Sequence, residues 1–116
     1  ALLDFSRAEA KRPEIANTVE NFEDYDVIFI GYPIWWGDMP NIVYTFLESY
    51  DFSGKTIVPF CTHGGSGLAG TESTIEDITG GTVAEGFAIA GTTAQNDRER
   101  AAEAVDEWLR EAGYIE

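Results

Sequence analysis

Two short stretches of this sequence combine residue types that could bind a ligand. The first is Tyr32-Pro33-Ile34-Trp35-Trp36-Gly37, which holds two adjacent tryptophans. Each indole has up to about 200 Å² of mostly apolar surface, so a loop that carries two of them is costly to leave in water. One interpretation is an aromatic wall for a planar, π-rich ligand. The other is that one or both indoles pack under the following helix or in a subunit interface.

The second stretch is Cys61-Thr62-His63-Gly64-Gly65-Ser66-Gly67. Its glycines let a ligand approach the backbone closely, and exposed amides before a helix favour an acceptor-rich or anionic group. His63 stands without a second histidine or a nearby carboxylate, so it is no metal site and is interpreted as a hydrogen-bonding spacer. Cys61 is predicted to be a small buried hydrophobe.

Several nucleotide and catalytic motifs are absent or incomplete. Gly65 to Gly70 fits G-x-G-x-x-G, but a dinucleotide site needs an acidic residue about 20 positions later, where Ala90 and Gly91 stand. The sequence has no P-loop and no G-x-S-x-G nucleophile elbow. A phospho-accepting receiver domain needs an Asp after its central strand, and the strand here ends in Gly31-Tyr32.

Both stretches follow runs of β-branched and aromatic residues that predict strands buried on two faces, over 27–32 and 56–61. A weaker strand is predicted over 86–90. Helices are predicted after Asp38 as N-cap to about 50, over 68–79, and from a capping box at Asn96 to Gly113. A further short helix is expected from Pro13 to Phe22. This alternation indicates an α/β sheet, whose ligands lie beyond the carboxyl ends of the strands.

Composition narrows the class of protein further. The 116 residues, with 44% hydrophobic side chains, suit one globular domain. The formal net charge is −14, with only 7 Lys and Arg residues, which argues against nucleic acid and anionic membranes as partners. It favours a basic protein partner, although solubility alone also explains it. A single cysteine excludes an internal disulfide and, with no signal peptide, predicts a reducing, cytoplasmic setting.

Residues 25–37 (YDVIFIGYPIWWG) and 46–67 (FLESYDFSGKTIVPFCTHGGSG) together resemble the bacterial flavodoxin-like family, whose members bind FMN. The resemblance implies a three-layer sandwich with a parallel sheet, and an electron carrier or a flavin-dependent reductase of quinones or similar acceptors. It also implies that the first loop flanks the isoalloxazine ring, with Trp35 or Trp36 stacked on it. The second loop would contact the pyrimidine edge of the ring. The implied FMN-binding residues are Pro33, Ile34, Trp35, Trp36, Gly37, Thr62, His63, Gly64, Gly65, Ser66 and Gly67.

The chain departs from the family at its start. Ala1 in place of Met suggests a fragment or a processed product, and residues 1–116 are expected to form one flavodoxin-like domain without strands 1 and 2 and without the phosphate loop. Strand 27–32 would then be an apolar edge, predicted to pair with a second copy in a homodimer or with a separate fragment. The alternative function is a flavin-free interaction domain that associates through this edge.

Overall fold

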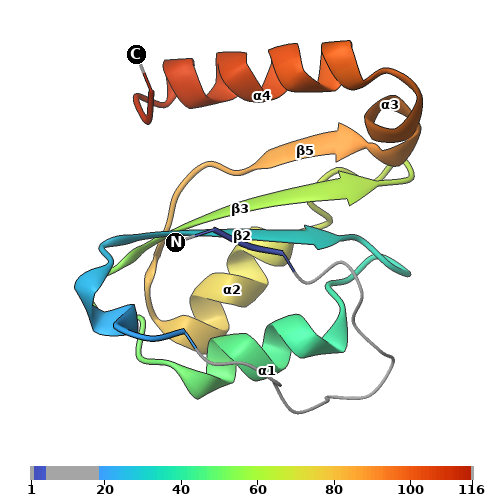
Figure 1. Ribbon diagram of the computed structural model, residues 1–116. Helices are drawn as coiled ribbons and strands as arrows, with labels where there is room; N and C mark the ends of the chain where they lie inside the picture. Colours follow the sequence, from blue (N-terminus) through green and yellow to red (C-terminus); the bar gives the residue numbers. More distant parts are fainter. Residues whose placement is uncertain (1, 5–18, 116) are drawn as a thin grey trace.

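The computed structural model describes residues 2–4 and 19–115 as a parallel sheet between two helical layers (Figure 1). α1 and α2 cover one face, and α4 lies over the other. The strands are β1 (Leu2–Asp4), β2 (Val27–Pro33), β3 (Thr56–His63), β4 (Thr82–Val83) and β5 (Phe87–Ala90). The helices are the 3₁₀ turn η1 (Phe22–Asp24), α1 (Asn41–Ser49), α2 (Thr71–Thr79), α3 (Gly91–Asn96) and α4 (Arg98–Glu111). The α/β class and the parallel sheet predicted from the alternation are therefore confirmed.

The two predicted central strands form the middle of the sheet. β2 and β3 run parallel in one register, from Val27 opposite Thr56 to Pro33 opposite Thr62. Ile28, Ile30, Ile57 and Val58 are fully buried there. The matched register brings the ends of both strands, and hence the two loops that follow them, to the same edge of the sheet.

The third predicted strand, over 86–90, is observed as β5, and the sequence did not predict the short strand β4 before it. Pro59 explains the gap between β4 and β5. β4 pairs with β3 at Thr56 and Ile57, whereas β5 pairs with it only from Phe60 onward. The Ile57 carbonyl accepts from the Ala84 amide on this side, so residue 59, two positions on, also turns its backbone groups this way. Proline has no amide hydrogen to donate, and the neighbouring strand is interrupted at that level.

The outer edge of β2 is not open along its whole length, as the sequence had suggested. β1 pairs with it in parallel, with Leu2, Leu3 and Asp4 opposite Phe29, Ile30 and Gly31. The expectation of an exposed edge over 27–32 is therefore wrong for 29–31. A short run such as residues 2–4 has no periodicity that sequence reasoning can use, because its pairing depends on a strand far along the chain. Pairing of this edge with a second copy stays a prediction.

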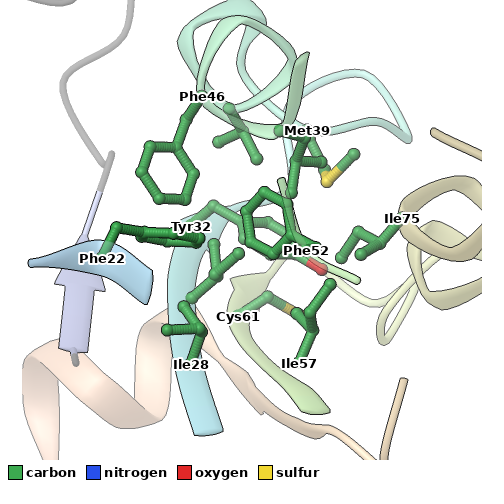
Figure 2. Packing of buried hydrophobic residues seen from close by; sticks show 12 residues of the cluster. Phe22, Ile28, Tyr32, Met39, Phe46, Phe52, Ile57, Cys61 and Ile75 are labelled. Atoms are coloured by element: carbon green, nitrogen blue, oxygen red, sulfur yellow. The ribbon is translucent and has the colours of Figure 1, made fainter. Parts of the chain in front are cut away.

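The buried core fills the space between the sheet and the α1–α2 layer, as Figure 2 shows. Its aromatic part joins Phe22 from η1, Phe46 from α1 and Phe52, whose rings meet edge to face with centroids 5.0 to 6.1 Å apart. Phe46 and Phe52 are each 1% exposed. This cluster packs against the α1–α2 face of β2 and β3 and holds α1 on the sheet.

The helix ends differ from prediction in detail. Pro40 is the N-cap residue of α1, and Asp38 does not cap it. Asp97, one residue later than the predicted Asn96, caps α4 by accepting a hydrogen bond from the Arg100 amide at 3.1 Å. Asn96 instead ends α3, a short helix that the sequence did not predict. Of the helix predicted over 13–22, only 19–22 lie within the described residues, and η1 begins at Phe22.

Candidate functional site

The loop after β2 is a tight turn that presents the tryptophan pair. Trp35 and Asp38 bond to each other through both backbone amides, at 2.8 and 3.0 Å. Between them, Trp36 has φ 54° and Gly37 has φ 76°. Positive φ at both central positions makes a type I′ turn, which glycine adopts freely and a bulky side chain does not. A tryptophan held in this conformation is a strained feature of the kind found at binding sites.

Asp38 ties this turn to α1. Its Oδ1 accepts hydrogen bonds from the Met39 amide at 2.7 Å and from the Tyr44 hydroxyl at 2.6 Å. Met39 is itself only 3% exposed and packs in the core. The acid predicted to start the helix therefore anchors the loop, and the turn has a fixed base.

Neither tryptophan is buried. Trp36 is 103% exposed and Trp35 is 41% exposed. The interpretation that one or both pack under the following helix is therefore wrong within the described part of the chain, and packing in a subunit interface stays a prediction. The two rings remain available to a ligand or a partner.

The loop after β3 is shaped by its glycines. Gly65 has φ 136°, Gly67 φ 61° and Gly70 φ 75°, values that side chains rarely tolerate. The Gly65 amide donates to Nδ1 of His63 at 3.0 Å, so the histidine folds back on its own loop as a spacer. The proton of the neutral imidazole then lies on Nε2.

Open space lies above this loop. A Cβ added at Gly64, Gly65 or Gly67 would meet no atom within 4 Å. Gly64 has an ordinary φ, so neither the backbone nor crowding within the protein requires glycine there. The amides of Ser66 and Gly67 donate no hydrogen bond to any other described residue. No described residue therefore competes for these donors with the acceptor atoms of a group that approaches the backbone.

The two loops are joined at their base. The Ile34 amide donates to the Thr62 carbonyl at 2.8 Å, which continues the β2–β3 ladder by one bond beyond Pro33. Below it, the Tyr32 hydroxyl is 2.7 Å from Oγ1 of Thr71, at the start of α2. The structure thus places the predicted residues 33–37 and 62–67 side by side at one edge of the sheet. Whether they bind FMN stays a prediction.

Burial sets the chemistry of the two titratable side chains beneath the loops. Burial, with a smaller contribution from Glu72, raises the pKa of the Cys61 thiol from 9.0 to about 11. Burial likewise raises the pKa of Tyr32 well above its usual range, although the Thr71 hydrogen bond opposes this. Both groups are neutral at physiological pH, and the prediction that Cys61 is a small buried hydrophobe is confirmed, since it is 3% exposed.

Cys61 should therefore resist alkylation. Below pH 9, a pKa raised from 9.0 to about 11 lowers the thiolate fraction about 100-fold, and burial slows the reagent further. We expect iodoacetamide at pH 8 to label the folded protein far more slowly than the urea-unfolded protein, as measured by mass spectrometry. The pKa of this thiol is higher in the folded than in the unfolded protein. The thiol therefore lowers the free energy of unfolding as pH rises from 9.0 to about 11. Equal labelling of folded and unfolded protein would contradict the burial of Cys61.

Charge around the two loops is sparse, and no cation lies in them. Residues 33–38 and 62–70 contain no Lys or Arg. Lys55 is 7% exposed and donates from Nζ to the carbonyls of Glu23 and Tyr25, at the opposite end of the strands. Within residues 2–4 and 19–115, no group of three or more His, Cys, Asp or Glu side chains could hold a metal ion. The described helices include none long and apolar enough to cross a membrane.

Sequence reasoning missed a cavity on the α4 face of the sheet. A cavity of about 520 Å³ lies between this face and α4, and Pro33 and Thr62 mark its end nearest the loops. Phe29, Phe60 and Phe87 line it from the sheet, and Trp108 lines it from α4. The signal was present in the sequence, because Phe29 and Phe60 lie on alternate positions that face away from the core. Only the strand register shows that these rings lie on one face.

Comparison with known proteins supplies the remaining evidence. A family profile described as flavodoxin matches residues 5–110. A crystal structure of a "putative flavoprotein" from Bacteroides uniformis superposes with a TM-score of 0.68 at 35% identity, covering 86% of this chain and 60% of that one. Another, from Bacteroides eggerthii, gives 0.67 at 35% identity, covering 90% and 61%. This chain thus spans about 60% of their length. No curated protein matches.

Proposed function

We propose that this chain, which belongs to the flavodoxin family, binds the isoalloxazine ring of FMN between the loops 33–37 and 62–67 and serves in electron transfer. One observation carries the proposal. An exposed tryptophan pair and a glycine loop with free amides lie side by side, joined by the bond from the Ile34 amide to the Thr62 carbonyl. The relatives described as flavoproteins support it.

The residues present suit a flavin ring. A planar aromatic system needs a flat apolar wall, which Trp35 and Trp36 provide, and its pyrimidine edge needs hydrogen-bond partners. The amides of Ser66 and Gly67 are the available donors, and the open space over Gly64 and Gly65 lets the edge approach the backbone.

The two loops offer few groups that could bind the FMN phosphate. The two loops contain no Lys or Arg, and Lys55 is engaged at the far end of β2 and β3. A phosphate dianion usually binds at a helix N-terminus, a nest of amides or an arginine. We therefore propose that this chain holds the flavin mainly through its ring, and that the described residues contribute little to binding the phosphate.

The bound cofactor would supply one- or two-electron redox chemistry. The chain's own contribution is to tune that chemistry. Amide donors at the pyrimidine edge stabilise the negative charge of a reduced ring, whereas the net charge of −14 destabilises it. Both loops are exposed, which suits an electron carrier that docks its ring edge against a basic partner, or a reductase of small quinone-like acceptors.

Titration of the purified protein with FMN and with riboflavin tests the proposal. We expect both flavins to quench tryptophan fluorescence, with dissociation constants that agree within about tenfold, because the two loops hold no Lys or Arg whose contact with the phosphate riboflavin would lose. Lumiflavin, which keeps the isoalloxazine ring and carries a methyl group in place of the ribityl chain, is the matched control and should also bind.

Two results would count against it. If none of the three ring compounds binds, the proposed flavin site is wrong and the flavin-free interaction domain is favoured. Binding of FMN but not riboflavin would show that a phosphate site dominates, against the ring-centred arrangement proposed here.

A further inference from the structure

His63 is the last residue of β3, where the strand enters the glycine loop. Its Cα lies opposite Ala90, the last residue of β5, so the two strands end level with each other. Because side chains alternate between the faces of a strand, His63 shares a face with the buried Cys61 of the core cluster. The imidazole is partly exposed at the edge of the sheet where the loops 33–37 and 62–67 meet.

One hydrogen bond decides which nitrogen of this imidazole carries the proton. The Gly65 amide donates to Nδ1 of His63 at 3.0 Å, and a ring nitrogen that accepts such a bond carries no hydrogen itself. The neutral ring therefore keeps its hydrogen on Nε2, because the bond made at one nitrogen sets the tautomer at the other. The glycine loop thus makes His63 a hydrogen-bond donor with a fixed tautomer and a fixed position.

Charged side chains are sparse around this donor. β5 and α3 lie beside the end of β3, and residues 86–96, which include both, contain no Asp, Glu, Lys or Arg. Two carboxylates flank the loops along the chain. Asp38 accepts two hydrogen bonds at the base of its own turn, and Glu72 accepts one from the Gly86 amide at 3.2 Å. Both carboxylates are therefore held by donors other than Nε2 of His63.

Nε2 is within reach of a group that meets the glycine loop. One ring carbon separates the two nitrogens, so Nε2 lies close to the Gly65 backbone that holds Nδ1. A Cβ added at Gly64 or Gly65 would meet no atom within 4 Å, which leaves room for a ligand beside the loop. The amides of Ser66 and Gly67 donate to no other described residue. A planar group with several acceptor atoms along one edge could meet these amides and the imidazole together.

We propose that His63 binds the flavin by donating a hydrogen bond from Nε2 to an acceptor atom at the pyrimidine edge of the ring. This inference rests on the flavin site proposed above and gives the side chain a role beyond that of a spacer. The pyrimidine edge suits the donor because it carries carbonyl oxygens and ring nitrogens. A donor already fixed by the Gly65 bond loses little conformational entropy when the ligand binds.

His63→Asn and His63→Gln distinguish a flavin contact from a spacer. In asparagine, Oδ1 replaces Nδ1 and can accept from Gly65, but no donor reaches the position of Nε2. In glutamine, the amide nitrogen reaches that position, but Gly65 loses its acceptor. We expect His63→Asn to bind FMN and riboflavin about threefold to tenfold more weakly than the wild type at pH 8, the cost of one hydrogen bond. His63→Gln should bind at least as tightly as His63→Asn, whereas a spacer role predicts the reverse order.

Nuclear magnetic resonance of the imidazole nitrogens gives a readout that does not depend on affinity. At pH 8 we expect the flavin-free protein to carry the ring hydrogen on Nε2, and riboflavin to shift the Nε2 resonance more than that of Nδ1. Thermal melts check that both variants fold. Wild-type affinity in His63→Asn, weaker binding by His63→Gln than by His63→Asn, or a ring hydrogen on Nδ1 would overturn the contact and leave the flavin site standing. If the wild type binds no flavin, the site and the contact are both wrong.

Discussion

Replacing Trp35 with alanine should lower the affinity for FMN and riboflavin about tenfold to a hundredfold. Stacking of an aromatic base on an aromatic side chain contributes about 1–3 kcal/mol, which corresponds to this range. Trp35 is the better wall of the two because its backbone is fixed by the paired bonds to Asp38 and its ring is partly covered, at 41% exposure. A ring held in place loses less entropy when a ligand stacks on it.

The matched variant is Trp36→Ala at the tip of the same turn. Trp36 is 103% exposed, so its removal should leave the free energy of unfolding within about 0.5 kcal/mol and reduce flavin affinity less than Trp35→Ala does. Fluorescence titration gives the affinities, and urea denaturation gives the stabilities. If neither substitution changes flavin affinity, the stacking role assigned to this turn is wrong. A larger loss for Trp36→Ala would instead move the stacking role to that residue.

The second large effect concerns stability. Phe46→Ala should lower the free energy of unfolding by about 3–5 kcal/mol, the usual cost of removing a fully buried phenyl ring. Phe46 is 1% exposed and has ring contacts with Phe22, Tyr50 and Phe52, at centroid distances of 6.1, 5.0 and 5.7 Å. The cavity left behind would border three aromatic rings that cannot all move into it.

Phe46→Leu is the graded control, since leucine fills much of the same volume and should lose clearly less stability. Chemical denaturation with tryptophan fluorescence and circular dichroism measures both variants. A loss below about 1 kcal/mol for Phe46→Ala would show that the α1 layer does not hold the sheet as described. The partners Phe22 and Phe52 precede β2 and β3, whereas the flavin loops follow these strands at their other ends, so any Phe46→Ala protein that still folds should keep its flavin affinity.

The central part of the fold could be read directly from the sequence. The apolar runs at 27–32 and 56–61 predicted β2 and β3 to within one or two residues, because residues buried on both faces leave a continuous hydrophobic signal. The order of strands and helices then placed the Trp35–Trp36 loop and the Gly64–Gly67 loop at one edge of the sheet. That inference needed only the rule that parallel strands end together.

Other features depended on distant partners. β4 and β5 are two strands because Pro59 in β3 has no amide hydrogen to donate to the strand beside it. Asp38 anchors the turn because its carboxylate accepts hydrogen bonds from the Tyr44 hydroxyl and the Met39 amide. Its position before a helix had predicted an N-cap instead. The pairing of β1 with β2 required knowing where residues 2–4 lie in space.

The sequence by itself determined the fold class, the two central strands and the composition of the two loops, because these follow from local patterns of hydrophobicity, glycine and tryptophan. Only the tertiary structure decided that both tryptophans are exposed among the described residues, that a Cβ added to the glycine loop would meet no atom, and that a cavity of about 520 Å³ lies between the sheet and α4. Exposure and empty volume depend on which surfaces meet when strands far apart in the chain take one register. A local sequence pattern therefore does not predict which side chains are exposed or where a cavity lies.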